Sequence, residues 1–255
     1  LAVQSGFATR AYRSADGITS GLPGSVGITT TLACAGFGAI SGASLAATSI
    51  FGKMALPEMR RLGYDKSFAT GLIASAGTFS SMIPPSMLFI IYALFTNTSV
   101  AKLFFAGIIP GILSAIVYSI YTYFYAKRNK ELIERQKAEP KYNFKERVTL
   151  VVSSWPIALV AFTILGGIYT GFFTPTEAAA IGCVLVLVIG FFEGKFRKFS
   201  DLSGAFRESA NVTSMIFLIN IGALFYAKVL VLSRLPSEIT AYLTNLDVPP
   251  SVILF

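Results

Sequence analysis

Two long apolar stretches of this sequence are interrupted near their centres by small, polar and helix-breaking residues. The first stretch covers residues 25–51 and has the sequence GFGAISGAS at residues 36–44. The second covers residues 67–95 and has the sequence SSMIPPS at residues 80–86. In a bilayer every backbone N–H and C=O group needs a partner, so a helix break survives only where protein or a polar cavity covers it. The interruptions therefore predict membrane-embedded helix ends that meet inside the protein.

The composition agrees with a polytopic, all-α membrane protein. Of the 255 residues, 54% are hydrophobic and 13% are charged, and the mean hydropathy is +0.66. The formal net charge is +8, but the basic residues stand in blocks between apolar runs, which indicates membrane topology rather than nucleic-acid binding. The sequence contains no histidine, which excludes histidine metal ligands and general bases. Cys34 and Cys183 lie far apart in apolar segments, so no disulfide framework is expected.

Further apolar runs are expected to form membrane helices. They cover residues 101–126, 148–173, 178–192 and 212–232, and a last run starts near Ser237. The longer runs meet the roughly 20 residues that a spanning helix needs, whereas 178–192 is short and must recruit its neighbours.

The basic residues favour a re-entrant hairpin over residues 25–51. Four blocks hold all but three of the 21 basic residues. The blocks are Arg10 with Arg13, Lys53 to Lys66, Lys127 to Arg147, and Lys195 to Arg207. If residues 25–51 crossed the membrane, the first block would lie opposite the others. A hairpin returns to its starting side and places all four blocks on the cytoplasmic face, as the positive-inside rule favours. Its arms of about 13 residues would be too short to span. One long tilted helix is the alternative.

The block at residues 127–147 mixes basic and acidic residues and contains Pro140. This composition predicts a cytoplasmic linker with some amphipathic helix, which joins two halves of the protein. A lipid-binding basic patch is less favoured because the acidic residues offset the positive charge.

The two breaks supply candidate binding groups. Pro84 and Pro85 lack the N–H groups that would bond the carbonyls of Ser80 and Ser81 in a continuous helix. Uncharged oxygen atoms suit a hard cation such as Na⁺, and helix N-termini at the breaks suit an anion. The alternative is a proline kink packed against small residues. The expected sodium and substrate site consists of Ser41, Gly42, Ala43, Ser44, Ser80, Ser81, Ile83, Pro84, Pro85 and Ser86. Within that set, the Na⁺ ligands are expected to be Ser41, Ser44, Ser80 and Ser81.

Glu177 follows an apolar run and invites assignment as an intramembrane carboxylate. The sequence Thr174-Pro-Thr-Glu177 instead fits a capping box, with Thr174 at the N-cap, Pro175 at the first helical position and Glu177 at the third. We therefore predict that Glu177 caps a helix.

Five motifs resemble the large, DctM-type membrane subunit of TRAP (tripartite ATP-independent periplasmic) transporters, in the same order along the chain. They are FGAISGAS (37–44), ALPEMRRLGYD (55–65), IPPSM (83–87), LFFAGIIPG (103–111) and GFFTPTEAAA (171–180). The resemblance implies an elevator-type ion-transporter fold with two inverted repeats, each with a hairpin and a broken helix.

By this resemblance the chain divides into three parts. Residues 1–126 are the first-repeat transport region, with the hairpin at 25–51, the broken helix at 67–95 and a following helix at 101–126. Residues 127–147 are the cytoplasmic linker, and residues 148–255 begin the second, incomplete repeat. We expect the chain to be a fragment that lacks N-terminal scaffold helices and the second hairpin.

The resemblance implies sodium-coupled uptake of an organic acid, of the C4-dicarboxylate or sialic-acid type, across a bacterial or archaeal inner membrane. A periplasmic binding protein would deliver the substrate, a small membrane subunit would accompany the chain, and no organic cofactor is expected. A one-component sodium-coupled anion or citrate-type carrier is the alternative. An enzyme is not expected, because no aspartate pair lies in an apolar run and each cysteine lacks a partner base.

Overall fold

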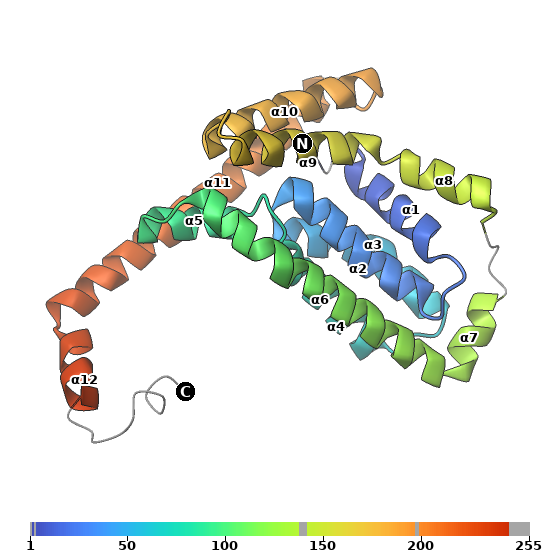
Figure 1. The fold of residues 1–255 in the computed structure, drawn as a ribbon, viewed down its shortest axis with the longest axis horizontal. Coiled ribbons are helices and arrows are strands. Elements are labelled where there is room, and N and C mark those ends of the chain that lie inside the picture. The colour runs from blue at the N-terminus through green and yellow to red at the C-terminus, as the bar shows by residue number, and fades with distance from the viewer. Residues whose placement is uncertain (1, 3, 138–141, 197–198, 245–255) are drawn as a thin grey trace. The chain divides into compact units, whose positions relative to one another are not determined.

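The computed structural model describes residues 2, 4–137, 142–196 and 199–244, and the regular elements within them are α-helices (Figure 1). The helices are α1 (Phe7–Thr19), α2 (Ser25–Ser41), α3 (Ser44–Arg61), α4 (Lys66–Ser80), α5 (Met87–Thr96), α6 (Val100–Arg128), α7 (Lys130–Lys137), α8 (Phe144–Val152), α9 (Trp155–Tyr169), α10 (Pro175–Phe192), α11 (Phe199–Leu232) and α12 (Leu235–Thr244). They fall into two units, α1–α10 and α11–α12. The predicted all-α fold is confirmed.

The first interrupted stretch forms a helical hairpin. Helix α2 ends at Ser41, α3 begins at Ser44, and the two helices pack against each other. Gly42 adopts φ = +58°, a left-handed conformation that glycine reaches without steric penalty. Its N–H closes α2 by donating to the carbonyl of Gly38 at 2.9 Å. A single helix through residues 25–51 is therefore excluded.

The hairpin is longer than the sequence predicted. Its arms have 17 and 18 residues, and α3 continues to Arg61 instead of ending at Phe51. Beyond Phe51 the apolar run stops, but the helix remains amphipathic, with Ala55 and Met59 fully buried. The expected boundary was wrong because the end of a continuous apolar run does not by itself end a helix.

The second interrupted stretch is also broken where predicted. Helix α4 ends at Ser80 and α5 begins at Met87. Between them the Pro84–Pro85 peptide bond is cis. Directly after the end of α4, Ser81 and Met82 form a tighter turn. The N–H of each donates to the carbonyl three residues earlier, at 3.2 and 2.9 Å.

The hairpin lies at the centre of its unit. Helix α2 packs against α1, α4, α6 and α9, and α3 packs against α4. In Figure 1 this arrangement appears as α2 running between α1 and α6. The core includes Phe37 and Phe51, both fully buried. Their rings pack edge to face, with the ring centroids 5.8 Å apart. The hairpin is therefore held on several sides, by helices that precede it and by helices that follow it in the chain.

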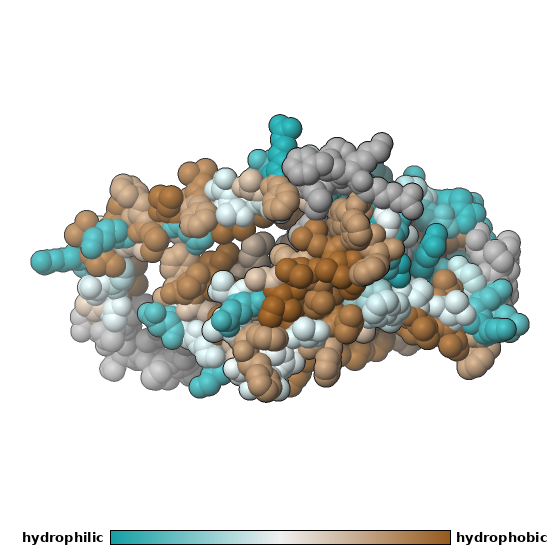
Figure 2. Space-filling view, turned by 90° about the horizontal axis from the view of Figure 1, so that it is seen from above, coloured by the Kyte–Doolittle hydropathy of each residue, from teal (hydrophilic) through white to brown (hydrophobic). Residues whose placement is uncertain are grey.

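Three helical segments among the described residues are long and apolar enough to cross a membrane: α6, α10 and Ser203–Leu232 of α11. Helices α8 and α9 would add a fourth if together they form one bent span. Large apolar side chains are exposed over much of the protein, and Figure 2 shows them on one face. This distribution is typical of a surface that contacts lipid.

The run at 148–173 was expected to be one helix, but it is divided. Helix α8 ends at Val152, α9 begins at Trp155, and the axes are bent by 41°. Ser154 occupies the N-cap of α9, and Pro156 follows in its first turn. Proline has no N–H to continue the hydrogen-bond ladder of α8, so the Ser-Trp-Pro sequence was an available signal for this bend.

The predicted linker at 127–147 contains two helical segments. Helix α7 follows α6 after one residue, and α8 begins at Phe144, before the apolar run starts. Asn143 and Glu146 form a capping box for α8. Pro140 lies outside the described residues. The expectation of some amphipathic helix in this segment is confirmed.

Candidate functional site

The hairpin tip lies directly against the break between α4 and α5. A Cβ atom added to Gly38 would lie 2.3 Å from the carbonyl oxygen of Ser80, and one added to Gly42 would lie 2.3 Å from that of Pro85. These distances leave no room for any side chain, so the two backbones are in contact. We call this contact between residues 38–44 and residues 80–86 the tip junction.

Both main-chain breaks therefore meet at one place, as paired interruptions in a membrane protein require. Among the described residues, no N–H or O–H group donates to the carbonyl oxygens of Ser80, Ser81 or Pro85. The freed carbonyl groups that the two prolines predicted are thus present. The carbonyls of Ser80 and Pro85 point at the glycines of the hairpin.

The serine hydroxyls on the α4–α5 side are buried and uncharged. Ser80 and Ser86 are fully buried, and Ser81 is 5% exposed. The hydroxyls of Ser80 and Ser81 each donate to the carbonyl oxygen three residues earlier, at 2.6 and 2.8 Å. The hydroxyl oxygen of Ser86 caps α5 by accepting the N–H of Phe89 at 3.4 Å. Each hydroxyl oxygen keeps lone-pair capacity for a further donor or a cation.

The hairpin side of the tip junction offers different groups. Ser41 Oγ accepts a long hydrogen bond of 3.5 Å from the N–H of Ala43. Ser44 is the first residue of α3, and its N-cap Ala43 provides no side-chain cap. The N–H groups in the first turn of α3 therefore lack the side-chain acceptor that Ser86 provides to α5. A helix N-terminus in this state favours a negatively charged ligand.

Ile83 is placed differently from the other predicted site residues. Its side chain packs against α6, where a Cβ on Gly111 would lie 2.7 Å from Ile83 Cγ1. A Cβ on Gly107 would lie 2.5 Å from the carbonyl oxygen of Met82. The break is therefore held between the hairpin and α6, with Ile83 as a packing residue. Gly38, Gly107 and Gly111 were not among the predicted site residues, although glycines inside apolar runs are a signal of close helix approach.

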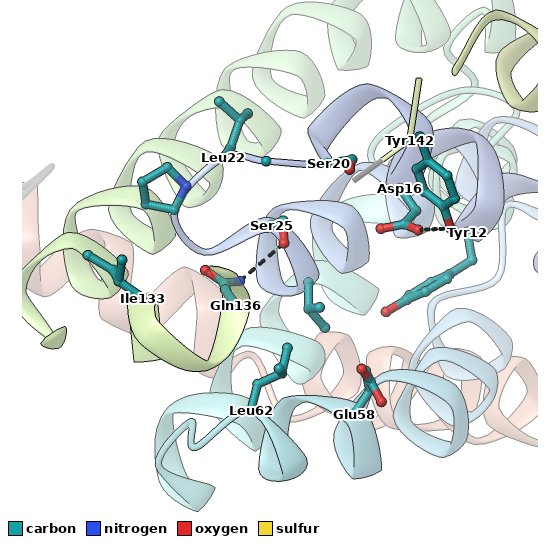
Figure 3. A pocket seen from close by; sticks show the side chains of 13 residues that line it. Tyr12, Asp16, Ser20, Leu22, Ser25, Glu58, Leu62, Ile133, Gln136 and Tyr142 are labelled. Atoms are coloured by element: carbon teal, nitrogen blue, oxygen red, sulfur yellow. Dashed lines mark hydrogen bonds between the residues drawn. The ribbon is translucent and has the colours of Figure 1, made fainter. Parts of the chain in front are cut away.

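A second region, which we call the hairpin base, contains a cavity of about 410 Å³ (Figure 3). It is lined by Tyr12, Asp16, Ser20, Gly21, Leu22, Pro23, Ser25, Val26, Glu58, Leu62, Ile133, Gln136 and Tyr142. The Gln136 amide from α7 accepts the N–H of Gly24 at 2.9 Å and donates to Ser25 Oγ at 3.1 Å. Helix α7 is thereby joined to the start of the hairpin.

Helix α7 also contacts the other end of the hairpin. Arg135 donates to the carbonyl oxygen of Arg61 at 3.4 Å. Nearby, the Tyr142 hydroxyl donates to Asp16 Oδ2 at 2.9 Å (Figure 3). Burial, together with this carboxylate, raises the pKa of Tyr142 above its ordinary value. Both ends of the hairpin therefore lie against one helix of the linker, as a chain that returns to its starting side requires.

Glu177 is exposed and acts as a helix cap. Its N–H donates to Thr174 Oγ1 at 3.3 Å, and its carboxylate accepts the Thr174 N–H at 2.8 Å. The predicted capping box is confirmed. Among the residues that the structure describes, no three cysteine, aspartate or glutamate side chains are grouped to hold a metal ion.

Comparison with known proteins gives a consistent result. The family model described as "Tripartite ATP-independent periplasmic transporter, DctM component" matches residues 1–255. The C4-dicarboxylate TRAP transporter large permease protein of Pseudomonas aeruginosa is 34% identical over 98% of this chain and 57% of its own length.

Two further relatives carry other substrate names. The ectoine/5-hydroxyectoine TRAP transporter large permease protein of Ruegeria pomeroyi is 35% identical over 91% of this chain and 53% of its own length. The sialic acid TRAP transporter large permease protein of Vibrio cholerae is 28% identical over 98% of this chain and 57% of its own length. The chain thus spans little more than half the length of these relatives.

The predicted resemblance is confirmed over every described helix, including both interruptions and the motifs beside them. Members of the matched family are transporter permeases and not enzymes. This chain belongs to the DctM family of large membrane permease subunits of tripartite ATP-independent periplasmic transporters.

Proposed function

We propose that this chain forms part of a sodium-coupled permease that imports an organic acid, and that the tip junction is its ion and substrate site. The observation that carries the proposal is the meeting of two interrupted membrane segments through bare backbone at Gly38 and Gly42. Discontinuous helices that meet in this way are the usual framework of binding sites in secondary transporters.

The groups at the tip junction fit a sodium ion. A hard cation prefers uncharged or anionic oxygen ligands, and this region offers unpaired carbonyl oxygens and buried hydroxyls. Ser41 and Ser44 from the hairpin and Ser80 and Ser81 from α4 and its extension are the proposed ligands. The hydroxyls of Ser80 and Ser81 already donate their hydrogen atoms to backbone carbonyls. The remaining lone pairs of these two oxygens can therefore only accept, which is what a cation ligand does.

The uncapped first turn of α3 fits the acidic part of the substrate. C4-dicarboxylates, ectoine and sialic acid, the substrates in the names of the three relatives described above, share a carboxylate group. Because α3 begins at Ser44 without a side-chain cap, its N–H groups are available to that carboxylate. The substituents that distinguish the substrates would contact other residues.

The remaining parts of the system follow from the family. We propose a small membrane subunit and a periplasmic binding protein as partners, in a multi-pass assembly of the inner membrane that works by an elevator movement. Within it, residues 1–126 form the transport region, 127–147 the cytoplasmic linker and 148–255 the start of the second repeat. The positions of both hairpin ends against α7 support the shared cytoplasmic side.

The test is an uptake assay in cells that express the full-length permease with its partner subunits. Radiolabelled succinate, ectoine and N-acetylneuraminate are supplied with and without Na⁺. We expect sodium-dependent uptake of one of them. The double substitution Pro84→Ala and Pro85→Ala supplies N–H donors for the carbonyls of Ser80 and Ser81, so it should abolish that uptake while the protein still inserts. Unchanged sodium dependence in this variant would refute the assignment of the site.

A further inference from the structure

Arg10 connects α1 to two other places in the protein, the bend between α8 and α9 and the end of α10. It lies on α1, which leads directly into the hairpin. Its guanidinium group donates to the carbonyl oxygen of Ser153 at 2.9 Å and pairs with Glu193 Oε1 at 2.6 Å. In return, Ser154 Oγ donates to the carbonyl oxygen of Arg10 at 3.1 Å. One side chain thus joins α1 to the α8–α9 bend and to the end of α10.

The bend between α8 and α9 needs the donor that Arg10 supplies. In a continuous helix the carbonyl of Ser153 would accept the N–H of Ile157. At the bend the N–H of Ile157 donates instead to the carbonyl oxygen of Ser154 at 2.9 Å. The carbonyl of Ser153 is left without its helical partner, and the Arg10 guanidinium takes that place.

Glu193 needs a cation for a separate reason. It is the C-cap of α10, where the negative end of the helix dipole disfavours a carboxylate. Its side chain is 19% exposed and that of Arg10 is 28% exposed. Its second oxygen, Oε2, is buried and has no hydrogen-bond partner among the described residues. Without Arg10 a largely buried carboxylate would lose its counter-charge, which is strongly unfavourable.

Helix α1 is in turn bound to the hairpin. It packs along α2, and the hydroxyls of Thr19 and Thr29 share a buried hydrogen bond of 2.5 Å. Any displacement of α2 relative to α9 and α10 therefore acts on α1, and the bonds of Arg10 lie at that boundary.

We propose that Arg10 is a positioning residue that locks α1, and with it the hairpin, to the α8–α9 bend and to α10. This inference rests on the proposed function for its consequence, because the lock matters to transport only if the hairpin moves. Breaking the lock should free α1 and change the rate of transport without changing the substrate site, since Arg10 is on α1 and not at the tip junction.

The first measurement needs no transport. In the full-length permease without other cysteines, Ala15→Cys places a reporter on the buried face of α1, where Ala15 is 5% exposed. We expect Arg10→Gln to raise the rate of maleimide labelling by at least about fivefold, because hydrogen bonds to charged groups contribute at least that factor. Arg10→Lys keeps the charge but has one nitrogen, so its rate should lie between those of Arg10→Gln and Arg10. Arg13→Gln, an exposed arginine on the same helix, should leave labelling unchanged.

The second measurement is uptake per permease molecule in the membrane. The substrate is whichever of succinate, ectoine and N-acetylneuraminate the unmodified transporter takes up. Arg10→Gln should change the turnover by at least about fivefold and leave KM within about twofold. Loss of protein amount with normal turnover per molecule would reduce Arg10 to a folding role and overturn the proposal, as would labelling equal to that of Arg13→Gln. If none of the three compounds is taken up, the proposed function fails. The labelling rates still test whether Arg10 holds α1 in place.

Discussion

The two ends of the hairpin are held in opposite ways. At the tip junction, backbone lies against backbone through Gly38 and Gly42, with buried serines and no charged side chain at either break. At the hairpin base, long polar side chains such as Gln136 and Arg135 reach across from α7 beside a cavity of about 410 Å³. The tip is therefore fixed by shape, which admits no added atom, whereas the base is held by separate hydrogen bonds of small individual strength.

This contrast suits the two tasks that the proposed function assigns to them. Groups that bind a small ion must be held within fractions of an ångström, and direct backbone contact provides that. A connection to a linker needs to persist while its surroundings move, and a set of side-chain contacts can rearrange one bond at a time.

The largest effect is expected at Gly42. Gly42→Ala places a Cβ 2.3 Å from the carbonyl oxygen of Pro85 in a residue whose φ is +58°. Neither a backbone carbonyl nor the left-handed conformation adapts easily to this change, so the tip should separate from the α4–α5 break. Sodium-dependent uptake should be lost, and thermal unfolding in detergent should shift to clearly lower temperature.

Gly36 provides the matched control, since it lies in α2, the helix that Gly42 closes, and a Cβ there would meet nothing within 4 Å. Gly36→Ala should keep uptake and unfold at the same or a higher temperature, because alanine favours the helix by about 0.5–1 kcal/mol. Equal behaviour of the Gly42 and Gly36 variants would remove the steric account of the tip junction.

An intermediate effect is expected at the hairpin base. Gln136→Ala removes two hydrogen bonds, to Gly24 and Ser25, each typically worth about 0.5–1.5 kcal/mol. The melting temperature should fall modestly while sodium affinity stays unchanged. Gln136→Glu keeps an acceptor for the N–H of Gly24 and should lose less stability. If Gln136→Ala lost uptake as completely as Gly42→Ala, the hairpin base would tolerate as little change as the tip junction. That result would contradict the comparison.

The smallest effect is expected at Glu177, which belongs to neither end of the hairpin. Glu177→Gln retains a side-chain oxygen that can accept the Thr174 N–H, so transport and its pH profile should be nearly normal. Glu177→Ala loses the capping bond of 2.8 Å and should lower the unfolding temperature slightly. Abolished transport in Glu177→Gln at normal expression would instead require the carboxylate charge and would make Glu177 a coupling residue.

The positions of the breaks and caps were predictable from the sequence, because they follow from local backbone chemistry. Gly42 permits a left-handed residue, Pro84 and Pro85 remove donors, and the Thr174–Glu177 spacing defines a capping box whatever surrounds it. The membrane class follows equally directly from composition and from the distribution of basic residues.

Other features depended on the tertiary structure, because each involves a partner far away in the chain. Nothing near Gly38 in sequence indicates that it faces the carbonyl of Ser80, and nothing near Arg10 indicates Ser153 or Glu193. The continuation of α3 beyond Phe51 likewise accompanies burial of its inner face, at Ala55 and Met59, against neighbouring helices. Local residue type therefore determined where this chain breaks, while packing between distant helices decided what each break and each charged side chain contacts.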